Sequence, residues 1–221
     1  MTEGPDALLR RIEALVAELP PEAAGGVRDA APALAEFLAA LRFANETMNL
    51  VSASAARPDE LVGNHLRDAL EGLPLLPAPA GRRLALLDLG SGGGFPAVPI
   101  LLVRRDIDGW LVESTGKKAR FLSAICARLS LTASVLDARF PDSFPMTTPV
   151  HFDLLTSRAV ADAGRLVRRA RPLLRQGARA LLWTTERLYP GIRRASGCGN
   201  AAFHRASRGQ SRGIAVLQGF T

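Results

Sequence analysis

Apolar positions in the first 75 residues recur at helical spacing, without the alternation that marks a half-buried strand. One apolar stripe covers residues 8–19, and the Pro20-Pro21 pair is predicted to end that helix. A second helix is predicted to begin near Pro32, and a third opens at Pro58. Prolines between residues 74 and 79 then form a stiff connector. We therefore expect a helical N-terminal extension over residues 1–80.

From Leu84 onward the pattern changes to short apolar runs that alternate with helices, which is typical of a parallel sheet covered on both faces. The expected strands are residues 84–89, 109–113, 133–136, 152–156 and 179–184, and the expected helices are 96–103, 117–129 and 164–174. A final strand pair is expected at 201–206 and 213–218. Residues 81–221 are thus predicted to form an α/β, Rossmann-like domain.

A glycine loop, Asp88-Leu89-Gly90-Ser91-Gly92-Gly93-Gly94-Phe95-Pro96, joins the first strand to the first helix of this domain. Glycines at 90, 92 and 94 allow a sharp turn and a close approach to a ligand. A dinucleotide fingerprint would place its third glycine at position 95, where this chain has phenylalanine. The loop therefore favours S-adenosylmethionine over NAD.

The second strand ends on Glu113, 25 positions after Asp88. Nucleoside-binding proteins of this architecture place an acid there, which accepts hydrogen bonds from the ribose hydroxyls. Glu113 could instead support the start of the next helix, and both roles can coexist.

The chain has 221 residues, 48% of them apolar, which suits one globular domain or slightly more. Its first residues lack the basic and apolar regions of a secretory signal, and no apolar run is long enough to span a bilayer. We therefore expect a cytoplasmic protein with no membrane segment. Cys126 and Cys198 lack metal-ligand spacing, so neither a metal site nor a disulfide framework is expected.

The net charge of +7 is unevenly distributed. Residues 1–162 hold 16 basic and 20 acidic side chains, whereas residues 163–221 hold 12 arginines and one acid, Glu186. An arginine-rich genome would explain the preference for arginine over lysine, but not the loss of acids. The last quarter of the chain therefore favours contact with a nucleic acid.

Five segments together resemble the small-subunit ribosomal RNA guanine-N7 methyltransferases, also called the glucose-inhibited division protein B family. The glycine loop followed by Phe-Pro, together with a later Ser-Arg-Ala, is the specific part of the match. The matching segments are Met48-Asn49-Leu50, His65-Leu66-Arg67-Asp68, residues 87–96, residues 113–118 and residues 152–161.

The resemblance implies a class I methyltransferase domain, S-adenosylmethionine as the cofactor, and a guanine of 16S rRNA, free or in the small ribosomal subunit, as the acceptor. We also expect a monomer without a bound metal. The cofactor-binding residues carried over by the resemblance are Gly90, Gly92, Phe95, Glu113, Phe140, Pro141 and Arg158. Pro141 stands where the family usually has an acid beside the adenine.

Arg158 could alternatively form an ion pair with Asp153 or Asp162. His65 and Asp68, three residues apart on one helix face, are expected to fasten the N-terminal helix to the sheet domain rather than to catalyse. His151 and His204 are expected at the surface.

Guanine N7 has a free lone pair and no proton to lose, so this acceptor needs no general base, and no catalytic side chain is expected. The segment after the fourth strand, Thr156-Ser157-Arg158-Ala159, lacks the Asn/Asp-Pro-Pro-aromatic motif of amino methyltransferases. Neither cysteine is placed for pyrimidine C5 methylation. A small-molecule methyltransferase and a non-catalytic RNA-binding relic remain as alternatives.

Overall fold

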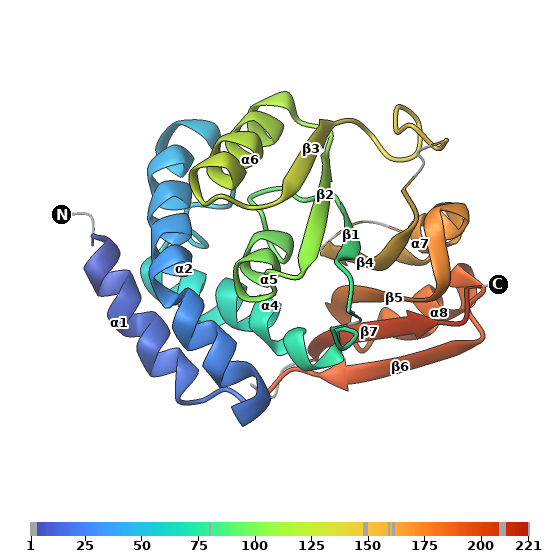
Figure 1. Cartoon of the computed structure of the whole chain (residues 1–221), viewed down its shortest axis with the longest axis horizontal. Coiled ribbons are helices and arrows are strands. Elements are labelled where there is room, and N and C mark those ends of the chain that lie inside the picture. Colours follow the sequence, from blue (N-terminus) through green and yellow to red (C-terminus); the bar gives the residue numbers. More distant parts are fainter. Residues whose placement is uncertain are drawn as a thin grey trace.

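A seven-stranded sheet forms the centre of the protein, in the order β3-β2-β1-β4-β5-β7-β6 (Figure 1). The computed structural model describes residues 4–79, 81–147, 150–158, 160, 162–207 and 211–220. The strands are β1 (Leu84–Leu89), β2 (Ile107–Glu113), β3 (Ala133–Asp137), β4 (Phe152–Arg158), β5 (Leu174–Thr185), β6 (Asn200–Arg205) and β7 (Arg212–Gln218). Strands β1 to β5 pair in parallel, whereas β7 pairs antiparallel with both β5 and β6.

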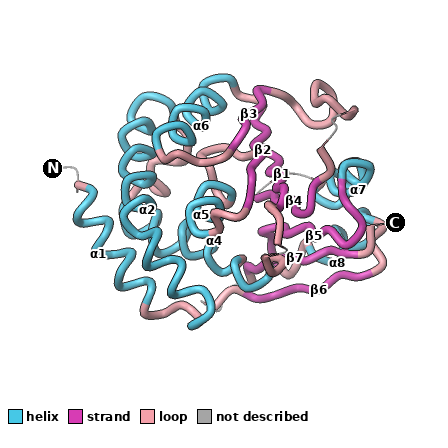
Figure 2. Tube along the Cα trace, viewed as in Figure 1, coloured by secondary structure: helices cyan, strands magenta, loops and turns pink. Residues whose placement is uncertain are grey.

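Helices cover both faces of this sheet (Figure 2). The helical elements are α1 (Pro5–Val16), α2 (Pro21–Met48), α3 (Pro58–Glu60), the π-helix η1 (Leu61–Leu66), α4 (Arg67–Glu71), the 3-10 helices η2 (Leu73–Leu75) and η3 (Arg171–Leu173), α5 (Ala97–Val103), α6 (Gly116–Arg128), α7 (Ala163–Ala170) and α8 (Tyr189–Ser196). In Figure 1, α1, α2, α4, α5 and α6 lie to one side of the strands and α7 and α8 to the other.

The strands contribute apolar side chains to two core clusters, one on each face of the sheet. Leu86, Leu154 and Leu181 belong to the apolar cluster that includes the N-terminal helices, whereas their neighbours Leu87, Leu155 and Leu182 belong to the cluster under α7 and α8. Successive side chains of a strand point to opposite faces, so each strand supplies both layers. The boundary at residue 80 stays a prediction, since the N-terminal helices share a core with one face of the sheet.

The elements predicted from the sequence are confirmed, but several bounds differ; α1 ends at Val16 and not at 19, and β5 begins at Leu174 and not at 179. Helix α2 begins at Pro21, not near Pro32, which lies inside it; proline is well suited to a first helical turn. Helix α7 ends at Ala170 and not at 174, and the chain continues as the 3-10 helix η3. Pro172 has no backbone N–H to donate to the carbonyl four residues earlier, so the α-helical hydrogen bonding stops there. Helix α8 has no counterpart in the sequence prediction, since Pro190 and Gly191 conceal its pattern. No helix in the described part of the chain is long and apolar enough to cross a membrane.

Helices α7 and α8 approach closely at Gly164. A Cβ there would lie 2.6 Å from the Ile192 carbonyl oxygen and 2.8 Å from the Ala195 Cβ. We expect Gly164→Ala to lower the free energy of unfolding by about 1–3 kcal/mol through overpacking. Gly191→Ala in α8 is the matched control, because its Cβ would meet nothing within 4 Å. It should leave stability unchanged or raise it by about 0.5–1 kcal/mol. Urea denaturation of both variants checks this, and equal midpoints would contradict it.

Candidate functional site

The carboxyl ends of β1, β2, β3 and β4 lie at one edge of the sheet, where ligands of parallel α/β folds bind. The parallel register places Asp88 of β1 opposite Thr156 of β4, and Glu113 of β2 opposite Asp137 of β3. The predicted glycine loop leaves the sheet at this edge, between β1 and α5.

The glycine loop has the conformation that its sequence predicts. Gly90, Gly92 and Gly94 have φ values of +75°, +55° and +97°, in the region that favours glycine. A Cβ on Gly90 would also lie 2.9 Å from the Val160 Cγ2, and one on Gly94 would lie 2.9 Å from the Val98 Cγ2. Gly90 is exposed and Gly92 half-buried, so the loop leaves their backbone accessible to a ligand, whereas Gly94 is buried against Val98 and Phe37.

Glu113 is buried and holds this loop in place. One carboxylate oxygen accepts a hydrogen bond from the Gly92 backbone N–H at 2.9 Å, and the other accepts one from the Thr115 N–H at 2.8 Å. Each oxygen retains a second lone pair. The carboxylate can therefore brace the loop and still accept a hydroxyl of a ligand.

Asp88, at the base of the loop, carries an unpaired acceptor. Its Oδ1 accepts a hydrogen bond from the Thr156 hydroxyl at 2.6 Å, but its Oδ2 is buried and has no hydrogen-bond partner among the described residues. Burial raises the pKa of Asp88 to about 6. A buried acceptor without a partner costs free energy, so this oxygen suits a cationic or hydrogen-bond-donating ligand group.

Arg158, at the end of β4, joins the loop to the N-terminal helices. Its guanidinium carbon lies 5.2 Å from the centre of the Phe95 ring, and one Nη donates a hydrogen bond to Nδ1 of His65. The other Nη lies 3.9 Å from the Asp68 carboxylate. Burial, with the Arg158 charge, lowers the pKa of His65 to about 4, so its ring is the neutral acceptor.

The alternative partners expected for Arg158 are therefore wrong. Asp153 lies at the start of β4 and pairs with Arg82 and Arg175, and Asp162 lies 3.8 Å from Arg165. Arg158 sits at the other end of the strand from Asp153, and its acid comes from the N-terminal helices instead.

Phe140 and Pro141 follow the end of β3 and are half-buried. The Phe140 ring packs against Phe144, with centroids 5.4 Å apart. The Ala138 N–H donates to the Glu113 carbonyl at 3.0 Å, which ties this segment to the end of β2. The segment therefore offers an apolar surface to a ligand, and Pro141 supplies no carboxylate or N–H.

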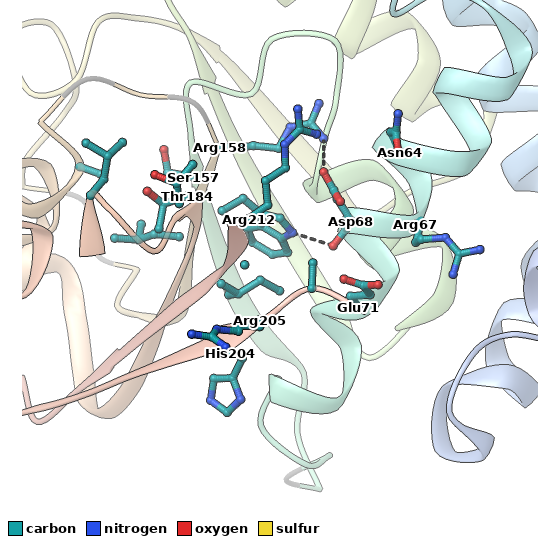
Figure 3. A pocket seen from close by; sticks show the side chains of 18 of the residues that line it. Asn64, Arg67, Asp68, Glu71, Ser157, Arg158, Thr184, His204, Arg205 and Arg212 are labelled. Atoms are coloured by element: carbon teal, nitrogen blue, oxygen red, sulfur yellow. Dashed lines mark hydrogen bonds and ion pairs between the residues drawn. The ribbon is translucent and has the colours of Figure 1, made fainter. Parts of the chain in front are cut away.

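A cleft of about 1460 Å³ opens beside Arg158 (Figure 3). Its walls come from η1 and α4, from the ends of β4 and β5, from the β6–β7 hairpin, and from the first turns of α7 and α8. Figure 3 shows Arg158 and Asp68 facing each other at the side of the cleft, and a dashed line marks their ion pair. The charged residues lining the cleft are Arg67, Arg158, Arg205, Arg212, Glu18, Glu60, Asp68, Glu71 and Asp162. Both signs are present, so the cleft interior is not a uniformly basic surface.

Three side chains of the sheet hold the segment of residues 65–75 against it. Besides Arg158, the Trp183 indole N–H donates to the Asp68 carbonyl at 2.6 Å, and Arg179 donates to the Leu75 carbonyl at 2.9 Å. The indole also lies over Gly72, where a Cβ would be 2.6 Å from its Cζ2.

The structure thus brings together Gly90, Gly92, Phe95, Glu113 and Arg158 at one edge of the sheet. Sequence reasoning placed His65 and Asp68 on one helix face but missed their partner, because Arg158 is 93 residues from His65. It also missed the cleft wall formed by the β6–β7 hairpin. Cys126 is buried, and burial raises the pKa of its thiol to about 11. His151 and His204 are exposed, as predicted.

Known proteins match this chain over the elements that form the site. The family model described as GidB, rRNA small subunit methyltransferase G, matches residues 30–193. The protein named ribosomal RNA small subunit methyltransferase G from Sorangium cellulosum is 39% identical over 165 residues, which cover 74% of this chain and 67% of that protein. Its namesake from Acidiphilium cryptum is 40% identical over 130 residues, covering 59% and 57% of the two chains.

Solved structures show the fold at lower identity. Cofactor-bound Rv0187 from MTB is 19% identical with a TM-score of 0.57, and the alignment covers 84% of this chain and 89% of that one. A methyltransferase from Pyrococcus furiosus is 12% identical with a TM-score of 0.52, covering 62% and 75%. The Rossmann-like methyltransferase fold predicted from the sequence is confirmed, and the family match runs through the glycine loop, Glu113 and Arg158.

Proposed function

This chain belongs to the rRNA small subunit methyltransferase G family, and from that premise we propose that it transfers a methyl group from S-adenosylmethionine to N7 of a guanine in 16S rRNA. The family resemblance and the rRNA methyltransferase class predicted from the motifs are confirmed by this membership. The observation that carries the proposal is the family match over residues 30–193. This match includes the glycine loop and the strands whose carboxyl ends surround it, which together we call the loop edge.

The loop edge is complementary to the polar groups of S-adenosylmethionine. The unpaired Asp88 Oδ2 suits the ammonium of the methionine part, and the Arg158 guanidinium suits its carboxylate. Glu113 has free lone pairs for the ribose hydroxyls, and the half-buried Phe140 offers an apolar contact to the adenine. The backbone of Gly90 and Gly92 is accessible to the ligand. Pro141 provides only van der Waals contact where relatives usually have an acid.

When bound, S-adenosylmethionine supplies an electrophilic methyl group on a sulfonium. Arg158 contacts Phe95 of the glycine loop and also lines the cleft, so the loop edge and the cleft meet at this side chain. A guanine held in the cleft can approach with its N7 lone pair, and no side chain has to remove a proton. The contribution of the protein is alignment of the reacting atoms and exclusion of water.

The direct test is incubation with methyl-labelled cofactor and either protein-free 16S rRNA or small ribosomal subunits. Nuclease digestion should release label as N7-methylguanosine. Label only on a small molecule would establish the small-molecule alternative, and failure to bind S-adenosylhomocysteine in calorimetry would establish the non-catalytic relic. Either outcome overturns the proposal.

A pH dependence of cofactor affinity follows from Asp88. Its pKa of about 6 means that the carboxylate is largely protonated at pH 5 and ionised at pH 7.5. The ionised form attracts the ligand ammonium, so affinity for S-adenosylhomocysteine should rise roughly tenfold over that interval. His65, with a pKa of about 4, stays neutral throughout. Calorimetry at graded pH measures this rise.

The control is Asp88→Asn, which removes the ionisation and keeps the size of the side chain. It should bind more weakly at pH 7.5 and show no rise with pH. A rise of wild-type size in Asp88→Asn would assign the titration to another group, such as Asp68, whose pKa burial also raises.

A further inference from the structure

Helices α7 and α8 lie on the sheet face opposite the N-terminal helices (Figure 1), and each helix carries exposed arginines. In α7, Val167 and Ala170 are buried against the sheet, whereas Arg168 and Arg169 are exposed. In α8, Ile192 is buried, whereas Arg193 and Arg194 are exposed. We call the exposed set Arg168, Arg169, Arg187, Arg193 and Arg194 the α7–α8 basic face.

The close crossing at Gly164 makes this a single surface. Because a Cβ at that position would lie 2.6 Å from the Ile192 carbonyl, the two helices pack with their backbones nearly in contact. Arginines on two short helices, and Arg187 just before α8, therefore gather on one side of the molecule.

Acidic partners are lacking on this surface. Among the described residues, no carboxylate lies within ion-pair distance of the five arginines of the α7–α8 basic face. Other arginines of the C-terminal quarter have partners within the protein: Arg175 pairs with Asp153, Arg179 donates to a backbone carbonyl, and Arg205 pairs with Glu186. Five of the twelve arginines of residues 163–221, those of the α7–α8 basic face, thus lie exposed on α7, on α8 or just before α8.

Helix dipoles explain only part of this arrangement. Arg168, Arg169, Arg193 and Arg194 lie in the last turns of their helices, where a cation contributes about 0.3–1 kcal/mol. One cation per helix would provide that gain, and Arg187 lies before α8 rather than at its end. Repulsion among five unpaired cations opposes folding, so the surface is better explained by an anionic partner.

The position of the α7–α8 basic face next to the cleft indicates which kind of anion it binds. Ala163, Gly164, Gly191 and Ile192, from the first turns of the same helices, line the cleft. The cleft itself carries acids and arginines in similar number, so it is suited to a base and not to a row of phosphates. A polyanion with one segment in the cleft would continue across α7 and α8.

We propose that the α7–α8 basic face binds the phosphate backbone of the rRNA next to the nucleotide that enters the cleft. This inference rests on the proposed function for the identity of the RNA. Arginine is the side chain best suited to phosphate, because its planar guanidinium donates two parallel hydrogen bonds. The contacts would be independent of sequence and would set position and affinity.

The test compares two triple variants in filter binding to a protein-free 16S rRNA transcript at graded potassium chloride. One is Arg168→Gln/Arg193→Gln/Arg194→Gln. The matched control is Arg10→Gln/Arg28→Gln/Arg105→Gln, which removes three exposed arginines from the other side of the molecule. The first variant should bind at least about tenfold more weakly near 0.1 M salt, with a salt slope smaller by about two to three. The control should bind within about twofold of wild type.

Calorimetry with S-adenosylhomocysteine should give wild-type affinity for both variants, which excludes misfolding as the cause. In methylation assays, the α7–α8 variant should show a raised KM for rRNA and a kcat near that of wild type. Wild-type salt dependence in the α7–α8 variant, or equal weakening in the control, overturns the proposal. If wild type methylates rRNA and the α7–α8 variant does so with unchanged KM, the surface is wrong and the proposed function stands. If wild type binds the transcript through this face but methylates no rRNA, the proposed function fails alone.

Discussion

Replacing Arg158 by methionine should lower the affinity for S-adenosylhomocysteine by at least about a hundredfold. The guanidinium is mostly buried between Phe95, His65 and Asp68, and the proposal gives it the ligand carboxylate as its anion. Removing one member of a buried, hydrogen-bonded charge pair costs about 2–5 kcal/mol, and the upper part of that range corresponds to more than a hundredfold. Calorimetry on the purified variant measures the change.

The matched control is Arg165→Met. Arg165 lies seven residues away in the chain, at the start of α7, and its side chain is largely exposed beside Asp162. Its loss should leave ligand affinity within about twofold, because exposed ion pairs contribute little. Arg158→Met also leaves Asp68 without its cation, so thermal unfolding must accompany the titration. Arg158→Lys keeps the charge and should recover part of the affinity; near-wild-type affinity in the folded Arg158→Met variant would contradict the role.

Gly94→Ala should be the most destabilising single change in the glycine loop, at about 2–4 kcal/mol. The φ of +97° strains any residue with a Cβ, and the new methyl would lie 2.9 Å from the Val98 Cγ2 and 3.2 Å from the Phe37 Cζ. Left-handed backbone costs about 1–2 kcal/mol and overpacking about 1–3 kcal/mol, and the two act together here. Urea denaturation measures the loss of stability.

Gly92→Ala separates the two causes. Its φ of +55° is also in the left-handed region, but a Cβ there would approach nothing closer than 3.8 Å. Backbone strain alone should cost about 1–2 kcal/mol. Equal losses in Gly92→Ala and Gly94→Ala would mean that the contacts with Val98 and Phe37 relax without cost.

Features encoded in short stretches of sequence were predictable. The central strands β1 and β4 are buried almost throughout because both faces of a parallel sheet are covered. The glycine spacing identifies a loop that must turn beside a ligand. Glu113 could be placed at the end of β2 by counting along the chain, and its carboxylate does lie against the loop, bonded to the Gly92 N–H.

Features that depend on distant packing were not predictable. Pro32 signals a helix start when read locally, but the stripe that continues through Val27 and Ala31 keeps α2 helical on both sides of it. The partners of Arg158 come from a helix 90 or more residues earlier, and their contact with Arg158 exists only once the N-terminal helices pack on the sheet. The antiparallel β7, inserted between β5 and β6, brings Arg205 and Arg212 to the cleft in a way that strand patterns alone do not specify.

The contacts that hold residues 65–75 against the sheet limit where this enzyme can be truncated or joined to a relative in a chimera. A catalytic module cut at residue 81 would lose the His65 and Asp68 contacts to Arg158, the carbonyl that accepts from Trp183 and the one that accepts from Arg179. Such a module would expose the Trp183 indole and leave Arg158 without His65 and Asp68. Chimeras between family members should therefore exchange the segment of residues 58–76 together with β4 and β5, which hold it.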